Sequence, residues 1–489
     1  MATRVTLHHF ESDPALPQRD GVNLAHAEIN RLLGSAAYPE LRVEFHDFSR
    51  LMRDGDYAAK VLAGVDCVLC NVGPHAHYYH HLRERLGFDF RIVRDIKTAL
   101  WSAYLLQESL CQPYLRAGDA LLATSQYSRA LTQHLFPHLR GGPIHLFEPV
   151  LAAPEERSAP PASRPRPDAA ITTLGYLGRL SEDKNFPQAV DLLIALDRKE
   201  PGRYRLVAVG AVHSASCEPG LVAERVRAAT GRDDLFVYLP PVGHDRVAAL
   251  LAGFDYFLFF STSNLEVLGR VLVEAADAGV PVLAANHAAA AELLAPSSLL
   301  DVAYDLDREF HSHFDAPLGS IDVEQAADRI RRREIPQTPP RPTINRPETL
   351  LSVLAGRAPD ITHEASRGLP PAQLQFLQRL RWDGLPRFSA RREAATVVES
   401  LSTWFCALNG RAGRDFESRL QELERRSRFK ERTRRFIAAA QTTRCDFTNL
   451  GGIDIELCNI AGYHPRFRLT SWPATESVPN ALPQSQASA

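Results

Sequence analysis

The chain has 489 residues, about three times the ~150 residues of an average domain, so two or three globular units are expected and a small disulfide scaffold is excluded. Hydrophobic residues make up 45% and charged residues 23%, which is ordinary for a soluble globular protein and argues against a wholly disordered chain. Basic side chains number 56 and acidic side chains 58, so the net charge of −2 offers no overall basic field for nucleic acid.

The amino-terminal segment and the cysteines together predict a cytoplasmic protein. Residues 1–10 lack the basic and apolar stretches of a signal peptide, and no run reaches the ~18 apolar residues of a spanning helix. The seven cysteines are odd in number and scattered, unlike a disulfide framework. Cys67 and Cys70 lie in an apolar run with no second ligand pair at zinc-ribbon spacing, so we expect core cysteines there.

Short apolar runs alternate with helical patterns twice along the chain, which is typical of βαβ units and parallel sheets. We expect an α/β fold in which residues 1–152 and 169–330 form two Rossmann-like domains facing across a cleft, with a proline-rich linker at 153–168. The predicted strands are Arg4–Phe10, Arg42–Phe48, Val65–Val72, Phe90–Asp95, Ala120–Ser125, Ile144–Phe147, Thr173–Leu177, Arg205–Val209, Leu235–Leu239, Tyr256–Phe260 and Val280–Ala284.

The pattern changes after about residue 330. A proline-rich stretch at 336–342 interrupts the chain, and a mainly helical extension is expected over 331–474. Leu374, Leu377 and Leu380 recur there at helical spacing. Residues 475–489 are polar, with proline and serine, and are predicted to be disordered.

The first motif with chemical content follows the predicted strand Thr173–Leu177. Gly178 ends that strand, and Arg179 and Lys184 stand on the loop that enters a helix. Two cations beside a helix entry suit a diphosphate group. A solvated surface loop is the alternative, but lysine occurs only five times in the chain, so Lys184 favours the phosphate interpretation.

The second motif follows the predicted strand Tyr256–Phe260, at the edge of the sheet where open α/β folds bind ligands. Glu266 stands on the loop, Gly269 opens a helix, and Glu274 lies near the second turn of that helix. Both carboxylates are therefore expected to face one pocket of nucleotide-sugar size. Taken alone, the pair would be better explained as surface carboxylates on an amphipathic helix.

Together, the two motifs resemble the carboxyl-terminal domain of GT-B glycosyltransferases of the group 1 type, also called family GT4, which are retaining enzymes. The resemblance covers residues 172–294, about a quarter of the chain. The matching residues are Gly178, Arg179, Leu180 and Lys184 in the first motif, and Glu266, Gly269, Glu274, Ala275, Gly279, Pro281 and Val282 in the second.

The resemblance implies a donor site on the second domain and an acceptor site on the first. Arg179 and Lys184 would hold the donor diphosphate, and Glu274 would accept hydrogen bonds from the ribose hydroxyls. Glu266, with the backbone around Leu268 and Gly269, would face the donor sugar. The implied reaction is that of a hexosyltransferase (EC 2.4), which moves a sugar with retention from a nucleotide-sugar co-substrate to a hydroxyl of a glycan or glycolipid. Neither a cofactor nor a metal is expected.

The first domain departs from the family where a mid-domain strand is usually followed by histidine. Arg94 takes the place of that histidine and Asp95 follows it. We expect both residues in the catalytic site, with Arg94 turned toward phosphate or an anionic acceptor and Asp95 orienting Arg94 or a sugar hydroxyl. The alternative is a structural ion pair between the two at the rim of the cleft.

This departure in the first domain leaves two other functions open. One is a GT-B scaffold that binds nucleotide sugar or a partner transferase with little turnover, and the other is a GT-B-like sugar-nucleotide epimerase. The Glu266 and Glu274 spacing favours a transferase over an epimerase by the same resemblance.

Two further clusters carry alternatives. The histidines of the helix after residue 72 are predicted to be solvated or to line the acceptor site, and a metal site there is the weaker interpretation. Basic residues crowd 425–435, which predicts either a solvated helix paired with nearby glutamates or a peripheral contact with the inner face of an anionic membrane. The histidines are His75, His77, His80 and His81.

Overall fold

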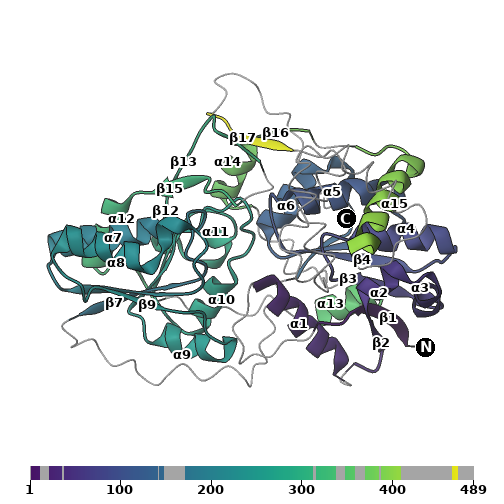
Figure 1. Ribbon diagram of the computed structural model, residues 1–489, viewed down its shortest axis with the longest axis horizontal. Coiled ribbons are helices and arrows are strands. Elements are labelled where there is room, and N and C mark those ends of the chain that lie inside the picture. Colours follow the sequence, from purple (N-terminus) through teal and green to yellow (C-terminus); the bar gives the residue numbers. More distant parts are fainter. Residues whose placement is uncertain are drawn as a thin grey trace, which may run out of the picture.

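The computed structural model describes residues 2–10, 21–35, 38–140, 142–147, 171–311, 315–337, 347–357, 369–384, 387–408 and 465–471. Two six-stranded parallel sheets, each flanked by helices, form the two lobes visible in Figure 1. The predicted α/β fold is therefore confirmed. Each predicted strand is present, with ends within two residues of those expected.

The first domain contains the sheet of order β2-β1-β3-β4-β5-β6. Its strands are β1 (Thr3–His8), β2 (Leu41–His46), β3 (Cys67–Cys70), β4 (Arg91–Ile96), β5 (Ala120–Ala123) and β6 (Ile144–Leu146). Its helices are α1 (Gly21–Gly34), α2 (Phe48–Arg53), α3 (Gly55–Leu62), α4 (Ala76–Leu86), α5 (Ser102–Cys111) and α6 (Gln126–Leu135). The central strands read as continuous apolar runs because helices cover both faces of a parallel sheet.

The second domain contains the sheet of order β12-β11-β10-β7-β8-β9. Its strands are β7 (Thr172–Leu177), β8 (Tyr204–Val209), β9 (Phe236–Leu239), β10 (Tyr256–Phe259), β11 (Val282–Ala285) and β12 (Leu299–Leu300). Its helices are α7 (Phe186–Lys199), α8 (Pro219–Thr230), α9 (Val247–Ala252), α10 (Arg270–Asp277), α11 (Ala290–Leu293) and α12 (Val323–Arg331). The short strands β13 (Val302–Tyr304) and β15 (Gly319–Ile321) pair with each other in antiparallel fashion.

The chain after α12 returns to the first domain. Leu350 and Leu354 of α13 (Pro347–Leu354) pack in the same apolar cluster as Val5 and Leu7 of β1. Helix α15 (Arg391–Leu408) contacts α4 and α5, and Figure 1 places α13 and α15 in the lobe of the first domain. The described helices α13 and α15 therefore pack on the first domain.

The extension also contains strands in a region that we expected to be mainly helical. After α14 (Pro371–Arg379), the strands β16 (Leu380–Asp383) and β17 (Arg466–Leu469) form an antiparallel sheet with β14 (Glu309–His311). Leu380 itself belongs to β16, so it does not continue the helical face of Leu374 and Leu377. Pairing between segments more than 150 residues apart leaves no local signal in the sequence.

An apolar cluster runs through both domains. It includes Leu100 and Tyr104 of the first domain together with Phe257 and Leu268 of the second. The two domains are thus packed against each other in this structure, and polar groups at the boundary are removed from water.

The prediction that the histidines of helix α4 are solvated is wrong. His75, His77, His80 and His81 are all buried, because α5 and α15 pack against α4. Burial lowers the pKa of His75 to about 3, so its ring is neutral at physiological pH. The described residues contain no group of three or more metal-ligating side chains placed to hold an ion.

The two cysteines of β3 are core residues, as predicted. Cys67 and Cys70 are buried, and burial raises the pKa of Cys67 to about 12, which keeps its thiol protonated. None of the helices in the described ranges is long and apolar enough to cross a membrane. The predicted linker at 153–168, the basic segment 425–435 and the tail 475–489 lie outside the described residues.

Candidate active site

The two sequence motifs meet at the point where the strand order of the second sheet reverses. Strands β7 and β10 are neighbours in the sheet although β8 and β9 separate them in sequence. Ligands of open α/β folds bind beside the carboxyl ends of the strands at such a switch point. The loop at 178–185 follows β7 and the loop at 261–269 follows β10, so both motifs border the same position.

Lys184 and Glu266 form an ion pair at this position. The Nζ atom of Lys184 donates to Oε2 of Glu266 at 2.6 Å, and Oγ of Ser261 donates to the same oxygen at 2.9 Å. Burial raises the pKa of Glu266, but the charge and hydrogen bond of Lys184 and the Ser261 hydroxyl outweigh it and hold the pKa below its usual range. Glu266 is therefore ionised at neutral pH and accepts hydrogen bonds rather than donating a proton.

Arg179 lies on the same loop as Lys184 and has two carboxylate partners. Its guanidinium donates to Asp183 at 3.1 Å and also to Asp315. Burial lowers the pKa of Arg179, and the two carboxylates raise it by more, so the side chain stays charged. Gly178, which precedes it, has a φ of +152°, a backbone conformation that side chains disfavour. The structure thus places Arg179 at the predicted position with its charge already balanced.

Glu274 has different partners from Glu266. Its Oε1 accepts from Nε of Arg270 at 2.8 Å and lies 3.0 Å from Nε2 of His244. Burial raises its pKa, while the His244 hydrogen bond and Arg270 lower it by more, so the carboxyl group is held ionised. The two glutamates of the second motif therefore sit in two separate polar clusters.

The start of α10 depends on Gly269. Its φ is +73°, and a Cβ atom there would lie 2.9 Å from Cζ of Phe259. Any other residue would be strained and would collide with the end of β10. Leu268 beside it is buried.

Two members of this site, Arg270 and His244, were not predicted from the sequence. Arg270 stands directly after Gly269 in the second motif, so its place in the pattern was a signal that could have drawn attention to it. His244 stands on the segment between β9 and α9, and nothing in the sequence around it indicates a contact with Glu274.

The first domain holds the backbone of the Glu266 loop. The N–H groups of Ala99 and Leu100 donate to the carbonyl oxygens of Leu265 at 3.2 Å and Asn264 at 2.9 Å. Oγ of Ser125 donates to the carbonyl oxygen of Val267 at 3.0 Å. The segment that follows β4 therefore lies directly against the loop that carries Glu266.

Arg94 and Asp95 do not pair with each other, so that alternative is wrong. They are successive residues of β4, and successive side chains of a strand point to opposite faces of the sheet. Arg94 is buried and makes a bidentate ion pair with Glu108 of α5, with Nε and Nη2 each 3.0 Å from a carboxylate oxygen. Its guanidinium is turned to α5 rather than presented to phosphate.

Asp95 belongs to a polar cluster on the other face of β4. Its Oδ2 accepts from Nζ of Lys97 at 2.6 Å and lies 3.8 Å from Nδ1 of His26 on α1. All three side chains are buried, and the ring of Phe10 stacks on His26. The catalytic role expected for Asp95 stays a prediction.

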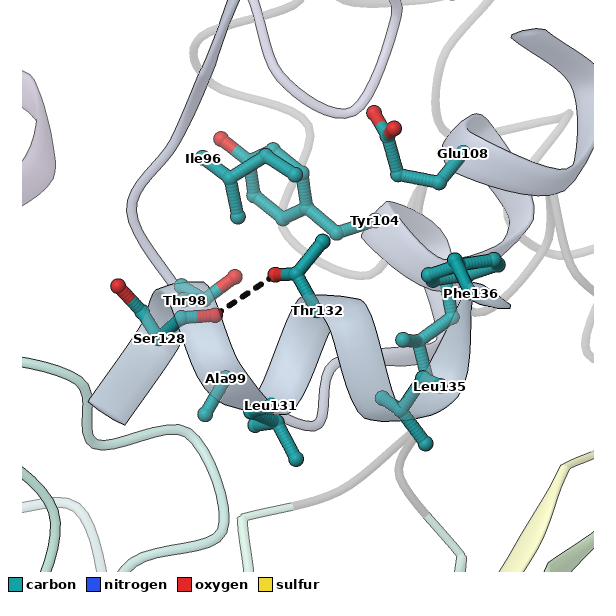
Figure 2. A pocket seen from close by; sticks show the side chains of 11 residues that line it. Ile96, Thr98, Ala99, Tyr104, Glu108, Ser128, Leu131, Thr132, Leu135 and Phe136 are labelled. Atoms are coloured by element: carbon teal, nitrogen blue, oxygen red, sulfur yellow. Dashed lines mark hydrogen bonds between the residues drawn. The ribbon is translucent and has the colours of Figure 1, made fainter. Parts of the chain in front are cut away.

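A cavity lies inside the first domain, and neither Lys184 nor Glu266 lines it. Figure 2 shows its lining, which comes from Ile96 at the end of β4, from Thr98 and Ala99 after it, from α5, and from α6 with Phe136 at its end. Oγ1 of Thr132 donates to the carbonyl oxygen of Ser128 at 2.8 Å in its wall. Glu108, the partner of Arg94, is also part of the lining. None of the four donor-side residues Arg179, Lys184, Glu266 and Glu274 borders it.

Comparison with known families agrees with the geometry of the second domain. Residues 167–300 match the family described as "Glycosyl transferases group 1". Over these residues, the second domain is similar to group 1 glycosyltransferases. Two Rossmann-like parallel sheets, the second of them in this domain, give the chain the GT-B architecture.

Solved structures similar to this GT-B chain include HepE of Anabaena in complex with UDP-glucose and the apo structure of OtsA. HepE is 15% identical with a TM-score of 0.44, and the match covers 82% of this chain and 99% of HepE. OtsA is 14% identical with a TM-score of 0.46, and the match covers 76% of this chain and all of OtsA. No curated protein matches the sequence.

Proposed function

We propose that this GT-B protein transfers a hexose-like sugar, with retention, from a nucleoside diphosphate sugar to a hydroxyl acceptor. The observation that carries the proposal is the Lys184 and Glu266 ion pair at the switch point of a domain similar to group 1 glycosyltransferases. A cation and an ionised carboxylate 2.6 Å apart suit a ligand with a phosphate next to a sugar. In this proposal the acceptor binds to the first domain, whose residues Ala99 and Leu100 border the Glu266 loop.

Lys184 and Arg179 act on the leaving group in this proposal. A nucleoside diphosphate gains negative charge as its bond to the sugar breaks, and fixed cations stabilise that charge more in the transition state than in the ground state. Arg179 exchanges its exposed partner Asp315 for phosphate and keeps the buried Asp183, which holds the guanidinium in place.

Glu266 acts on the donor sugar. Because it is ionised, it accepts hydrogen bonds from sugar hydroxyls and contributes negative charge near the oxocarbenium-like centre that forms as the bond breaks. In a retaining reaction without an enzymatic nucleophile, the departing phosphate accepts the proton of the acceptor hydroxyl. Glu274 holds the ribose hydroxyls at the other end of the donor.

The phosphate assignment is tested by the double variant Arg179→Gln/Lys184→Gln. We expect its affinity for a nucleoside diphosphate to fall about 100-fold, because two charged hydrogen bonds are lost, and its affinity for the matching nucleoside to stay within about threefold. Isothermal titration calorimetry with UDP, GDP and ADP and their nucleosides measures both. The control Lys199→Gln removes a lysine that pairs with Glu324 and Asp328 on the surface. Equal losses for diphosphate and nucleoside would contradict the assignment.

Transfer is also expected to need no divalent metal. Arg179 and Lys184 supply two fixed positive charges beside the leaving group. They can stabilise the negative charge of the departing diphosphate, as a bound metal cation would. The measurement is the rate of nucleotide release with an acceptor mixture in EDTA and after addition of Mg²⁺ or Mn²⁺. Complete loss of activity in EDTA that either cation restores would overturn this expectation.

The rate of nucleotide release also distinguishes a transferase from a scaffold that binds the donor without turnover. Binding of a nucleotide sugar with no release of nucleotide, in the presence or absence of acceptors, would favour the scaffold. We expect release, because the ionised Glu266 and its cation partner are both in place.

A further inference from the structure

Arg270 joins the donor-side carboxylate of the second domain to a carboxylate of the first. Its Nε donates to Oε1 of Glu274 at 2.8 Å, while Nη1 and Nη2 donate to the two oxygens of Glu28 on α1 at 2.7 and 2.6 Å. The side chains of Arg270 and Glu28 are 13% and 9% exposed. A guanidinium held by a bidentate carboxylate in a nearly dry place has a defined orientation.

The side chain of Arg270 lies along α1. Gly21 and Glu28 are seven residues apart on this helix and therefore share one face. A Cβ atom on Gly21 would lie 3.8 Å from Cδ of Arg270, so the stem of the arginine passes the start of α1 before its head reaches Glu28. Figure 1 shows α1 and α10 facing each other at the boundary of the two lobes.

Glu274 is left with one oxygen for a ligand. Oε1 is occupied by Arg270 and His244, whereas no group in the described part of the chain donates to Oε2. The free oxygen is the one that can accept a hydrogen bond from a sugar hydroxyl. Oε2 of Glu274 stays available only while Arg270 donates a single hydrogen bond to Glu274.

Glu28 determines how many hydrogen bonds Arg270 can donate to Glu274. Arg270 and Glu274 are four residues apart on α10, the spacing at which arginine and glutamate pair readily on a helix. Without Glu28, Nε and one terminal nitrogen of Arg270 can donate to both oxygens of Glu274 in a bidentate ion pair. With Glu28 in place, both terminal nitrogens are engaged by the first domain and only Nε reaches Glu274.

We infer that Glu28 is a positioning residue for donor binding, which acts through Arg270 to keep one oxygen of Glu274 open and so couples donor affinity to the contact between the domains. The inference rests on the proposed function, in which Glu274 binds the ribose. It predicts that a residue of the acceptor-side domain, more than 240 positions away from Glu274 in sequence and separated from it by Arg270, alters nucleotide affinity.

The test is a double-mutant cycle on the full chain, with UDP, GDP and ADP as probes in isothermal titration calorimetry. Glu28→Gln is expected to weaken the diphosphate that the parent binds best by about tenfold, since one charged hydrogen-bonded partner is lost. In an Arg270→Leu background, Glu28→Gln is expected to change the affinity by less than about twofold. The control Glu324→Gln removes a surface carboxylate that pairs with Lys199 and should leave affinity unchanged.

The outcomes separate the inference from the proposed function. Parental affinity in Glu28→Gln, or the same loss in both backgrounds, would overturn the coupling while the proposed function stands. A parent chain that binds none of the three diphosphates would overturn the proposed function and the inference with it. If Glu28→Gln yields little folded protein, Glu28→Asp serves the same comparison, because the shorter side chain cannot reach both terminal nitrogens of Arg270.

Discussion

Glu266→Gln is expected to lower the rate of sugar transfer about 100-fold or more, the loss typical when a preorganised electrostatic group is removed from an active site. The amide is close in shape to the carboxylate but carries no charge, so the oxocarbenium-like centre loses its stabilising anion. Lys184, released from its partner at 2.6 Å, stays available for phosphate, so the affinity for nucleoside diphosphate is expected to change by less than about threefold.

The measurement is a comparison of kcat and nucleotide affinity in Glu266→Gln and Glu274→Gln. Because the two carboxylates have separate partners, Lys184 and Ser261 for one and Arg270 and His244 for the other, we expect separate effects. Glu274→Gln should mainly weaken nucleotide affinity. If both variants kept parental kinetics, or if both lost affinity alike, the assignment of the two glutamates would be wrong.

Arg94→Met is expected to lower the free energy of unfolding by about 3–5 kcal/mol, the usual cost of leaving one member of a buried ion pair without its partner. Arg94 and Glu108 are both buried and joined by hydrogen bonds of 3.0 to 3.2 Å, so removal of the guanidinium leaves the charge of Glu108 without its counter-charge between β4 and α5. The double variant Arg94→Met/Glu108→Leu should recover most of the loss, because it removes both charges together.

Urea unfolding and the transfer rate of the folded fraction are the two measurements. We expect the rate to stay within about threefold of the parent, because Arg94 is turned away from phosphate. Arg232→Met, which removes an exposed arginine paired with Asp234, is the control and should leave stability unchanged. If Arg94→Met kept the parental free energy of unfolding but lost the transfer rate, the result would support a role of Arg94 in the active site.

The strand pattern was predictable because burial on both faces of a parallel sheet forces short apolar runs between helices. The meeting of Lys184 and Glu266 was predictable for a related reason. Each follows a strand, and the carboxyl ends of parallel strands lie at one edge of a sheet, so two loops after neighbouring strands must approach each other. The spacing of Glu266 and Glu274 likewise placed one residue before α10 and the other within it.

The partner of Arg94 was only partly predictable. Strand alternation alone rules out a pair between Arg94 and Asp95, because successive side chains of a strand point to opposite faces. The packing of α5 against β4 brings Glu108 beside Arg94, and the sequence does not show this packing. Burial of the α4 histidines depends in the same way on α15, a helix more than 300 residues further along the chain.

The sequence by itself determined the two parallel α/β domains, the switch-point position of the donor motifs and the residue types available for a nucleotide sugar. Local periodicity and strand direction are enough for these, because they act within one domain. The tertiary structure decided which charges pair. Glu28 and Arg270 meet across the domain boundary, and a buried ion must find its counter-charge wherever packing places one, so the partner follows from the contact surface of the folded domains and not from position in the chain.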